Sequence, residues 1–231
     1  LRDVYKRQVH GRALPLAQGV KMANKDLTVI ASGGDGDGYA IGMGHTIHAL
    51  RRNMNMTYIV MDNQIYGLTK GQTSPSSAKG FVTKSTPKGN IEKNVAPLEL
   101  ALSSGATFVA QGFSSDIKAL TKMIEDAIHH DGFSFVNVFS PCVTYNKVNT
   151  YDWFKEHLTS IDDIEGYDIT DKQLAMKTVL DHESLVKGIV YQDTTTPSYE
   201  SQISELEHEA LAKRDIHITE ETFNDLTAQF L

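Results

Sequence analysis

Short apolar runs that alternate with helical patterns constrain the fold of this chain more than any other feature. The runs are rich in β-branched and aromatic residues and nearly free of charge, which is typical of strands buried on both faces of a sheet. They are residues 27–32, 56–62, 107–113 and 133–141. Apolar residues spaced three or four apart predict helices around and between these runs. The helical segments are residues 12–23, 39–53, 97–105 and 115–132. This order predicts an α/β fold with a mostly parallel sheet and helices on both faces.

The pattern changes after about residue 150. Residues 171–181 are typical of a helix, residues 184–197 of a lone strand and turn, and the last thirty residues of short polar helices. We therefore expect an irregular C-terminal extension over residues 154–231, after an α/β domain over residues 9–153. Residues 1–8, LRDVYKRQ, start with leucine and are basic and unpatterned. We expect them to be a non-native or disordered segment ahead of an N-terminally truncated protein.

Composition excludes several classes of function. The 231 residues carry a formal net charge of −7, which argues against nucleic acid as the main partner. No apolar run approaches the roughly 18 residues that a membrane span needs. Cys142 is the only cysteine, so no internal disulfide is possible and a reducing cytoplasm is expected.

Glycines and aspartates alternate in GGDGDG, residues 33–38, directly after the first apolar run. Ligands of parallel α/β sheets bind beyond the carboxyl ends of the strands, and glycines allow close approach or a positive φ. A helix N-terminus at such a place favours phosphate, and a divalent cation such as Mg²⁺ would explain the acids beside it. The spacing does not fit a dinucleotide fingerprint, a Walker A loop or an EF-hand. The alternative that the segment is a purely structural glycine-rich turn remains open.

A second polar site follows the second apolar run. Asn63 stands 28 residues after Asp35, about the length of one strand–helix–strand unit. Such a unit places two neighbouring strand ends side by side. We therefore expect Asp35 and Asn63 to share one cation.

These residues belong to a longer pattern that resembles a known family. Gly34-Asp35-Gly36 with an asparagine about 28 residues later is the signature of thiamine diphosphate enzymes. IYGLTKGQTSP at 65–75 and SPCVTYN at 140–146 are more specific. Together they make the chain from about residue 9 to residue 153 similar to the β subunit of the 2-oxoacid:ferredoxin oxidoreductases, most of all to the 2-oxoglutarate type.

The resemblance implies roles for individual residues. Side chains of Asp35 and Asn63 and the carbonyl of Ile65 would bind Mg²⁺. Further positions would bind thiamine diphosphate; they are Gly34, Gly36, Asp37, Gly67 and Leu68. His10 and Lys70 match positions at the active site, although His10 could be a stray terminal histidine and Lys70 a solvated loop lysine.

Cys142 matches one of four thiolate ligands of a [4Fe–4S] cluster. The family's other three cysteines are missing from this sequence, so the chain as written should not hold the cluster alone. His129 and His130, at the end of a helical pattern, are expected to cap its dipole.

The implied activity is oxidative decarboxylation of a 2-oxoacid with coenzyme A, giving acyl-CoA and CO₂ and passing electrons to ferredoxin. An α subunit would hold the pyrimidine half of the cofactor, so this chain should be inactive alone. Two alternatives remain. One is a non-redox thiamine diphosphate decarboxylase or synthase, and the other is a non-catalytic cofactor-binding module.

Overall fold

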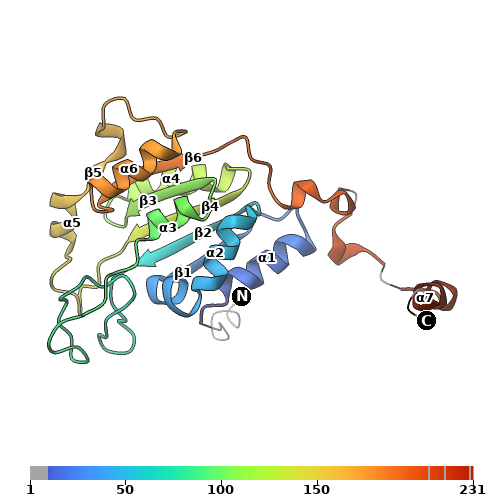
Figure 1. Cartoon of the computed structure of the whole chain (residues 1–231), viewed down its shortest axis with the longest axis horizontal. Helices are drawn as coiled ribbons and strands as arrows, with labels where there is room; N and C mark the ends of the chain where they lie inside the picture. Colours follow the sequence, from blue (N-terminus) through green and yellow to red (C-terminus); the bar gives the residue numbers. More distant parts are fainter. Residues whose placement is uncertain (1–9, 208, 216, 229, 231) are drawn as a thin grey trace.

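A six-stranded sheet forms the centre of the molecule (Figure 1). The structure is a computed structural model, and it describes residues 10–207, 209–215, 217–228 and 230. The predicted non-native segment, residues 1–8, lies outside these residues. The strands are β1 Ile30–Gly34, β2 Met56–Asp62, β3 Phe108–Phe113, β4 Phe133–Phe139, β5 Thr159–Ser160 and β6 Val186–Gln192. Their order is β1-β2-β4-β3-β6-β5, and all neighbours are parallel except β3 and β6. The predicted α/β class is confirmed.

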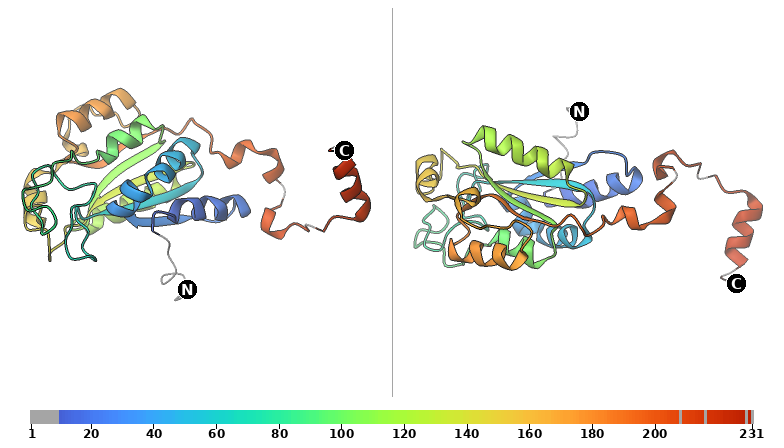
Figure 2. Two further views of the ribbon diagram at one scale, coloured as in Figure 1. Left: turned by 60° about the horizontal axis from the view of Figure 1, so that its bottom comes forward. Right: turned by 90° about the horizontal axis from the view of Figure 1, so that it is seen from above.

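Helices cover the two faces of the sheet unequally (Figure 2). The helices are α1 Ala13–Ala23, α2 Met43–Arg52, α3 Pro97–Ser103, α4 Ile117–His129, α5 Tyr151–His157, α6 Lys172–Asp181 and α7 Glu220–Ala228. One core joins α1, α2, α3 and α6 to the sheet, and a second core joins α4 to the other face. No helix among the described residues is long and apolar enough to span a bilayer.

The first strand differs from its prediction in position and in burial. It runs from Ile30 to Gly34 instead of over residues 27–32, because its ladder begins opposite the start of β2, with Ile30 beside Thr57. Ile30 and Met61 are about half exposed, so burial on both faces is wrong for this edge of the sheet. The reason is that α4 packs mainly over β3 and β4 and leaves β1 uncovered.

The sheet continues beyond the predicted division at residue 153. The lone strand predicted near residue 184 is β6, which pairs antiparallel with β3. Val186 and Val190 of β6 and Val179 of α6 belong to the same core as the preceding helices. Irregular structure therefore begins only after β6, and the division into domains remains a prediction.

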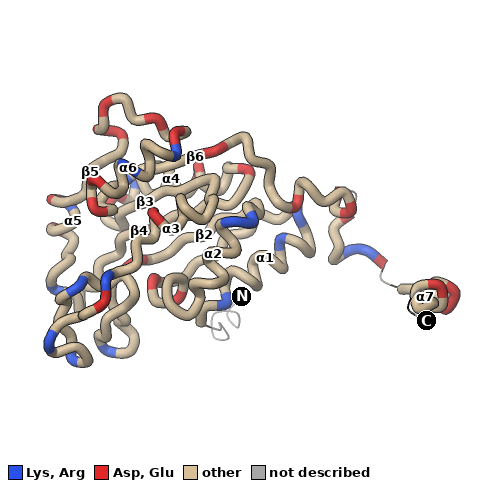
Figure 3. Tube along the Cα trace, viewed as in Figure 1, with Lys and Arg blue, Asp and Glu red and all other residues tan. Residues whose placement is uncertain are grey.

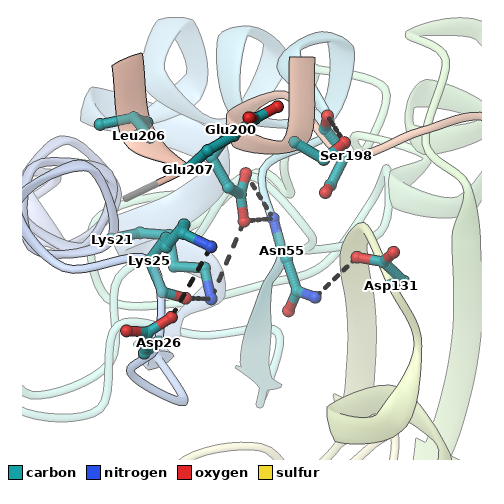
Figure 4. Close-up of a pocket in the computed structure, with 10 residues that line it drawn as sticks. Lys21, Lys25, Asp26, Asn55, Asp131, Ser198, Glu200, Leu206 and Glu207 are labelled. Atoms are coloured by element: carbon teal, nitrogen blue, oxygen red, sulfur yellow. Dashed lines mark hydrogen bonds and ion pairs between the residues drawn. The ribbon is translucent and has the colours of Figure 1, made fainter. Parts of the chain in front are cut away.

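A buried ion pair anchors the C-terminal segment to the amino end of the sheet (Figure 4). Lys21 Nζ lies 3.8 Å from Glu200 Oε1, and both side chains are 6% exposed. Glu200 also accepts hydrogen bonds from the backbone N–H of Asn55, at 3.1 and 3.2 Å. Beyond this anchor the chain leads away from the sheet to α7, in which no residue is buried (Figure 1).

His130 is the C-cap residue of α4, and its backbone N–H donates to the carbonyl of Asp126 at 3.1 Å. Its side chain is buried at the amino end of the sheet and contacts Thr107, so the prediction that the imidazole caps the helix dipole is wrong for this residue. Its Nε2 lies 2.8 Å from Thr107 Oγ1, whose hydroxyl donates to Asn53 Oδ1 at 2.6 Å. Since that hydroxyl has only one hydrogen, His130 must be the donor to Thr107. Burial lowers the pKa of His130, and the charges of Asp131 and Asp193 oppose this shift. His129, in contrast, lies 2.7 Å from the carbonyl of Glu125 in the last turn of α4.

The lowered pKa of His130 predicts that the contribution of this residue to stability falls with acidification. An unfolded histidine has a pKa of about 6.5, so as the pH falls through this value the unfolded chain takes up a proton that the folded chain refuses. Between pH 7.5 and pH 5.5 the urea midpoint of the wild type should therefore fall relative to that of His130→Gln, whatever the absolute stability of the variant and whatever other groups titrate. An equal change of the midpoint in both proteins would contradict the assignment.

Candidate functional site

The register of β1 and β2 brings the predicted ligands to one edge of the sheet. Gly34 pairs with Met61, so Asp35 follows at the level of Asp62, with Asn63 next along the chain. Asn63 Oδ1 accepts a hydrogen bond from the N–H of Ile65 at 3.0 Å, which folds the chain back at this point. Burial raises the pKa of the Asp35 carboxyl, and the nearby backbone N–H of Asn63 partly offsets this rise. The expected proximity of Asp35 and Asn63 is thus present in the structure.

Two buried carboxyl groups, those of Asp35 and Asp62, lie near each other at this edge. Asp35 is 3% and Asp62 is 2% exposed. Burial raises the pKa of Asp35, and burial together with the nearby Asp35 raises the pKa of Asp62 to about 8. Among the described residues neither carboxyl forms an ion pair with a lysine, an arginine or a histidine. A bound cation would offset the cost of burying both charges.

Close packing requires glycine at most positions of the GGDGDG segment. A Cβ on Gly36 would lie 2.1 Å from the ring of Tyr66, and a Cβ on Gly38 would lie 2.4 Å from the hydroxyl of Tyr58. The expectation of a positive φ is wrong for this segment, because none of its glycines adopts one. Gly34 is the exception to close packing, since its Cβ would meet only the carbonyl oxygen of Met61, at 3.9 Å.

Asp37 holds the described start of the chain against the turn before α2. Its Oδ1 accepts a hydrogen bond from the N–H of Gly11 at 2.6 Å and lies 2.9 Å from His10 Nδ1. The side chain of His10 is 57% exposed. These contacts bring His10 to the same edge of the sheet as Asp35. The predicted roles of His10 in catalysis and of Asp37 in cofactor binding stay predictions.

The remaining predicted site residues lie on a small hairpin after Ile65. Tyr66 and Gln72 form its single bridge, and Gly71 N–H donates to the carbonyl of Tyr66 at 2.8 Å. The tip between them carries Leu68, which is fully exposed, and Lys70, also exposed and with a φ of 75°. Both side chains are therefore available to a ligand or a partner. Their predicted roles are not tested by this geometry.

Comparison with known proteins assigns the family. Residues 6–138 match the family model described as "Thiamine pyrophosphate enzyme, C-terminal TPP binding domain". Residues 142–208 match the family model for the C-terminal part of the pyruvate ferredoxin oxidoreductase β subunit. A 2-oxoacid:ferredoxin oxidoreductase subunit beta from a Sulfolobus species is 42% identical over 205 residues, which are 84% of this chain and 67% of the relative. The chain belongs to the 2-oxoacid:ferredoxin oxidoreductase β subunits.

Two further relatives are similar to this β subunit. The 2-oxoglutarate oxidoreductase subunit KorB of Mycobacterium tuberculosis is 46% identical over 138 residues, 60% of this chain and 37% of the relative. A solved structure of 2-oxoglutarate:ferredoxin oxidoreductase from Magnetococcus marinus, with 2-oxoglutarate, coenzyme A and succinyl-CoA bound, superposes with a TM-score of 0.83. It is 37% identical, and the match covers 94% of this chain and 73% of that one. The predicted family, fold and enzyme class are confirmed.

In this β subunit, Cys142 lies at the same edge of the sheet as Asp35 and Asp62. Ser140 N–H donates to the carbonyl of Asp62 at 2.8 Å, which brings the segment after β4 beside the end of β2. A Cβ on Gly67 would lie 3.6 Å from Cys142 Sγ, so the thiol borders the hairpin. No group of three or more histidine, cysteine or acidic side chains that could hold a metal occurs among the described residues. One thiolate does not fit a [4Fe–4S] cluster, which needs four ligands.

The sequence did not predict the residues that form hydrogen bonds with Asp35 and Asp62 in this β subunit. Asn137 of β4 donates to Asp62 Oδ2 at 3.4 Å and to Gln111 Oε1 at 2.9 Å, and accepts from the Tyr39 hydroxyl at 2.7 Å. Ser74 donates to Asp35 Oδ2 at 2.5 Å. A polar residue inside a run expected to be fully buried, as at Gln111 and Asn137, was the available signal. The serine had none, because it stands in a loop without periodic pattern.

Proposed function

We propose that this β subunit binds Mg²⁺ and thiamine diphosphate at the carboxyl ends of β1 and β2. Together with an α subunit it would oxidise a 2-oxoacid, with 2-oxoglutarate favoured. The observation that carries the proposal is the pair of buried carboxyls, Asp35 and Asp62, which has no positive partner among the described residues and adjoins Asn63 and Ile65. A divalent cation bound there would stabilise the buried carboxylates, which have no such stabilisation in the apo protein.

The donor set fits Mg²⁺. The carboxylate of Asp35, the side-chain oxygen of Asn63 and the carbonyl of Ile65 are hard oxygen ligands, and Mg²⁺ is commonly held by one or two carboxylates together with substrate phosphates. Asp35 is the only charged member of this set. The Ile65 side chain is buried, which anchors the turn that presents its carbonyl.

Open space at two glycines supports the cofactor assignment. Protein packing does not exclude a Cβ at Gly34, and at Gly67 only ordinary contact with Cys142 would result. Glycine at these positions is explained by close approach of a ligand to the backbone. Bound thiamine diphosphate supplies an electron sink for the loss of CO₂ from a 2-oxoacid. The residues of this chain would bind the metal, neutralise the diphosphate and orient the ring.

A basic loop supports an anionic substrate at this edge (Figure 3). The whole chain has a formal net charge of −7, yet residues 63–96 contain five lysines and one glutamate. The lysines are Lys70, Lys79, Lys84, Lys88 and Lys93, and all of them are exposed. Their positive potential would attract 2-oxoacids and the phosphates of coenzyme A. The Mycobacterium relative and the Magnetococcus structure favour 2-oxoglutarate among the 2-oxoacids.

Electron transfer requires an iron–sulfur cluster and an external electron acceptor in addition to the residues described. We propose Cys142 as one ligand of a [4Fe–4S] cluster, whose other thiolates this sequence does not contain. Ferredoxin as the electron acceptor and an α subunit as the partner are proposed from the names of the relatives. A cytoplasmic location is proposed from the single, reduced cysteine.

The test is dye reduction by the α–β complex, with the β subunit expressed from its full reading frame. In the proposed reaction a 2-oxoacid and coenzyme A give acyl-CoA, CO₂, one proton and two electrons, which reduce two molecules of a viologen dye. We expect reduction to require Mg²⁺, thiamine diphosphate and coenzyme A, with 2-oxoglutarate used better than pyruvate. Decarboxylation that needs neither coenzyme A nor an acceptor would favour the non-redox alternative and contradict the proposal.

A further inference from the structure

We propose that Ser74 and Ser77 are positioning residues that hold the Asp35 carboxylate and the Asn63–Ile65 turn at the separation Mg²⁺ requires. The inference rests on the proposed function, because it concerns the same metal site. Both serines belong to residues 74–77 in the loop between β2 and α3, a segment that we call the serine turn. The consequence is that these two hydroxyls set the Mg²⁺ affinity of the site without touching the metal.

The first half of the argument is the contact between the serine turn and β1. Ser74 Oγ donates to Asp35 Oδ2 at 2.5 Å, and both residues are buried. This bond fixes the rotation of the carboxylate, and Ser74 is the only side chain among the described residues that donates to it, so Oδ1 can turn toward a cation. Without it, the carboxylate could turn about its side-chain bonds.

The second half is the contact between the same turn and the end of β2. Ser77 Oγ donates to the carbonyl of Gln64 at 2.7 Å and accepts from the N–H of Ser74 at 2.8 Å. Gln64 stands between Asn63 and Ile65 and has a φ of 58°, a conformation that residues other than glycine rarely adopt. The Ser77 hydroxyl therefore stabilises the unusual backbone that presents both remaining ligands.

The two halves form one continuous connection across the site. It runs from Asp35 through Ser74 and Ser77 to Gln64, over three hydrogen bonds that all involve buried serines. The N–H of Ser77 donates to the carbonyl of Ser74 at 3.0 Å and closes the turn. Mg²⁺ demands near-ideal octahedral geometry, so small changes in the separation of its ligands reduce affinity strongly. Partners that orient metal ligands typically change metal affinity by about 10- to 100-fold.

A buried serine away from the site supplies a control. Ser134 of β4 is fully buried, and its hydroxyl donates to the carbonyl of Ala127 at 2.6 Å. It lies at the amino end of the sheet, where it pairs with Thr57 and Phe108. Ser134→Ala removes a buried hydroxyl and leaves the three connecting bonds in place, so a general effect of removing a buried hydroxyl would be seen in this variant as well.

The experiment measures the Mg²⁺ concentration that half-saturates thiamine diphosphate binding to the α–β complex, by titration calorimetry. For Ser74→Ala and Ser77→Ala we expect this concentration to rise about 10- to 100-fold, with binding recovered at saturating Mg²⁺. Ser134→Ala should stay within about twofold of wild type, well below the change expected when an orienting partner is removed. Ser74→Thr, which keeps the hydroxyl, should restore most of the affinity. A merely structural role would lower the unfolding midpoint and leave the half-saturating concentration of the folded complex unchanged.

Several outcomes would overturn the inference. It fails if Ser74→Ala and Ser77→Ala both bind Mg²⁺ like wild type, or if Ser134→Ala weakens binding as much as they do. If one alanine variant does not assemble, the other variant and Ser74→Thr decide the question. Loss of binding in Asp35→Ala with normal binding in both serine variants would refute the positioning role and keep the metal site. Normal binding in Asp35→Ala would refute the metal site itself.

Discussion

Asp35→Ala is expected to abolish Mg²⁺-dependent binding of thiamine diphosphate to the α–β complex. Asp35 is the only charged ligand in the proposed set, so its removal leaves two neutral oxygens to hold a divalent cation. The loss should exceed the roughly 10- to 100-fold that is typical when only an orienting partner is removed. The measurement is calorimetric titration of thiamine diphosphate at saturating Mg²⁺.

The same substitution should not lower the stability of the unliganded protein. Burial and the proximity of Asp35 raise the pKa of Asp62, which shows that the two buried carboxyls repel each other. Removing one of them should leave the unliganded complex as stable as wild type or more stable. Asp26→Ala, at an exposed position, is the control and should change neither cofactor binding nor the stability of the unliganded complex. Lost binding together with a large loss of stability would mean that Asp35 has a structural role instead.

Glu200→Ala should lower the free energy of unfolding by about 3–5 kcal/mol, the usual cost of breaking a buried ion pair. The substitution leaves the ammonium of Lys21 buried beside two carbonyls, and it removes the acceptor of the Asn55 N–H. Urea unfolding measures the change. Cofactor binding should be preserved in the folded protein, because Glu200 is bound at Asn55, before the start of β2, whereas Asp35 follows the end of β1.

Two variants sharpen this test. Glu207→Ala changes an exposed acid on the same C-terminal segment and should alter stability by less than about 0.5 kcal/mol. The double variant Lys21→Met, Glu200→Leu should regain much of the loss, since no charge is left buried. A loss in Glu200→Ala no larger than in Glu207→Ala would show that the C-terminal segment is not anchored by this pair.

Strand positions could be predicted for β2, β3 and β4, each of which has a neighbouring strand on both sides. The bounds of β2 agree with the predicted run at residues 56–62, and those of β3 and β4 agree within two residues. The start of β1 could not be predicted, because it depends on its register with β2 and not on its own residues. The place of β6 beside β3 was not predictable either, since a single apolar run does not name its neighbour or its direction.

The candidate site was predictable to the extent that parallel topology determines it. Neighbouring parallel strands end at the same edge, and this alone places Asp35 near Asn63. The serine turn and the contact between His10 and Asp37 depend on how loops fold back in space. The buried environment of His130 was missed for a similar reason: in two adjacent histidines, sequence does not show which one faces the core.

The most direct test of the metal site is a crystal structure of the α–β complex with thiamine diphosphate and Mn²⁺ in place of Mg²⁺. Anomalous data collected between the K edges of manganese and iron locate the Mn²⁺ without reference to any assumed ligand and distinguish it from iron. The account predicts one strong manganese peak at the carboxyl ends of β1 and β2, bound by the Asp35 carboxylate, the Asn63 side-chain oxygen and the Ile65 carbonyl. A manganese peak held by other residues of the β subunit, or no manganese peak at this edge of the sheet at saturating Mn²⁺, would contradict it.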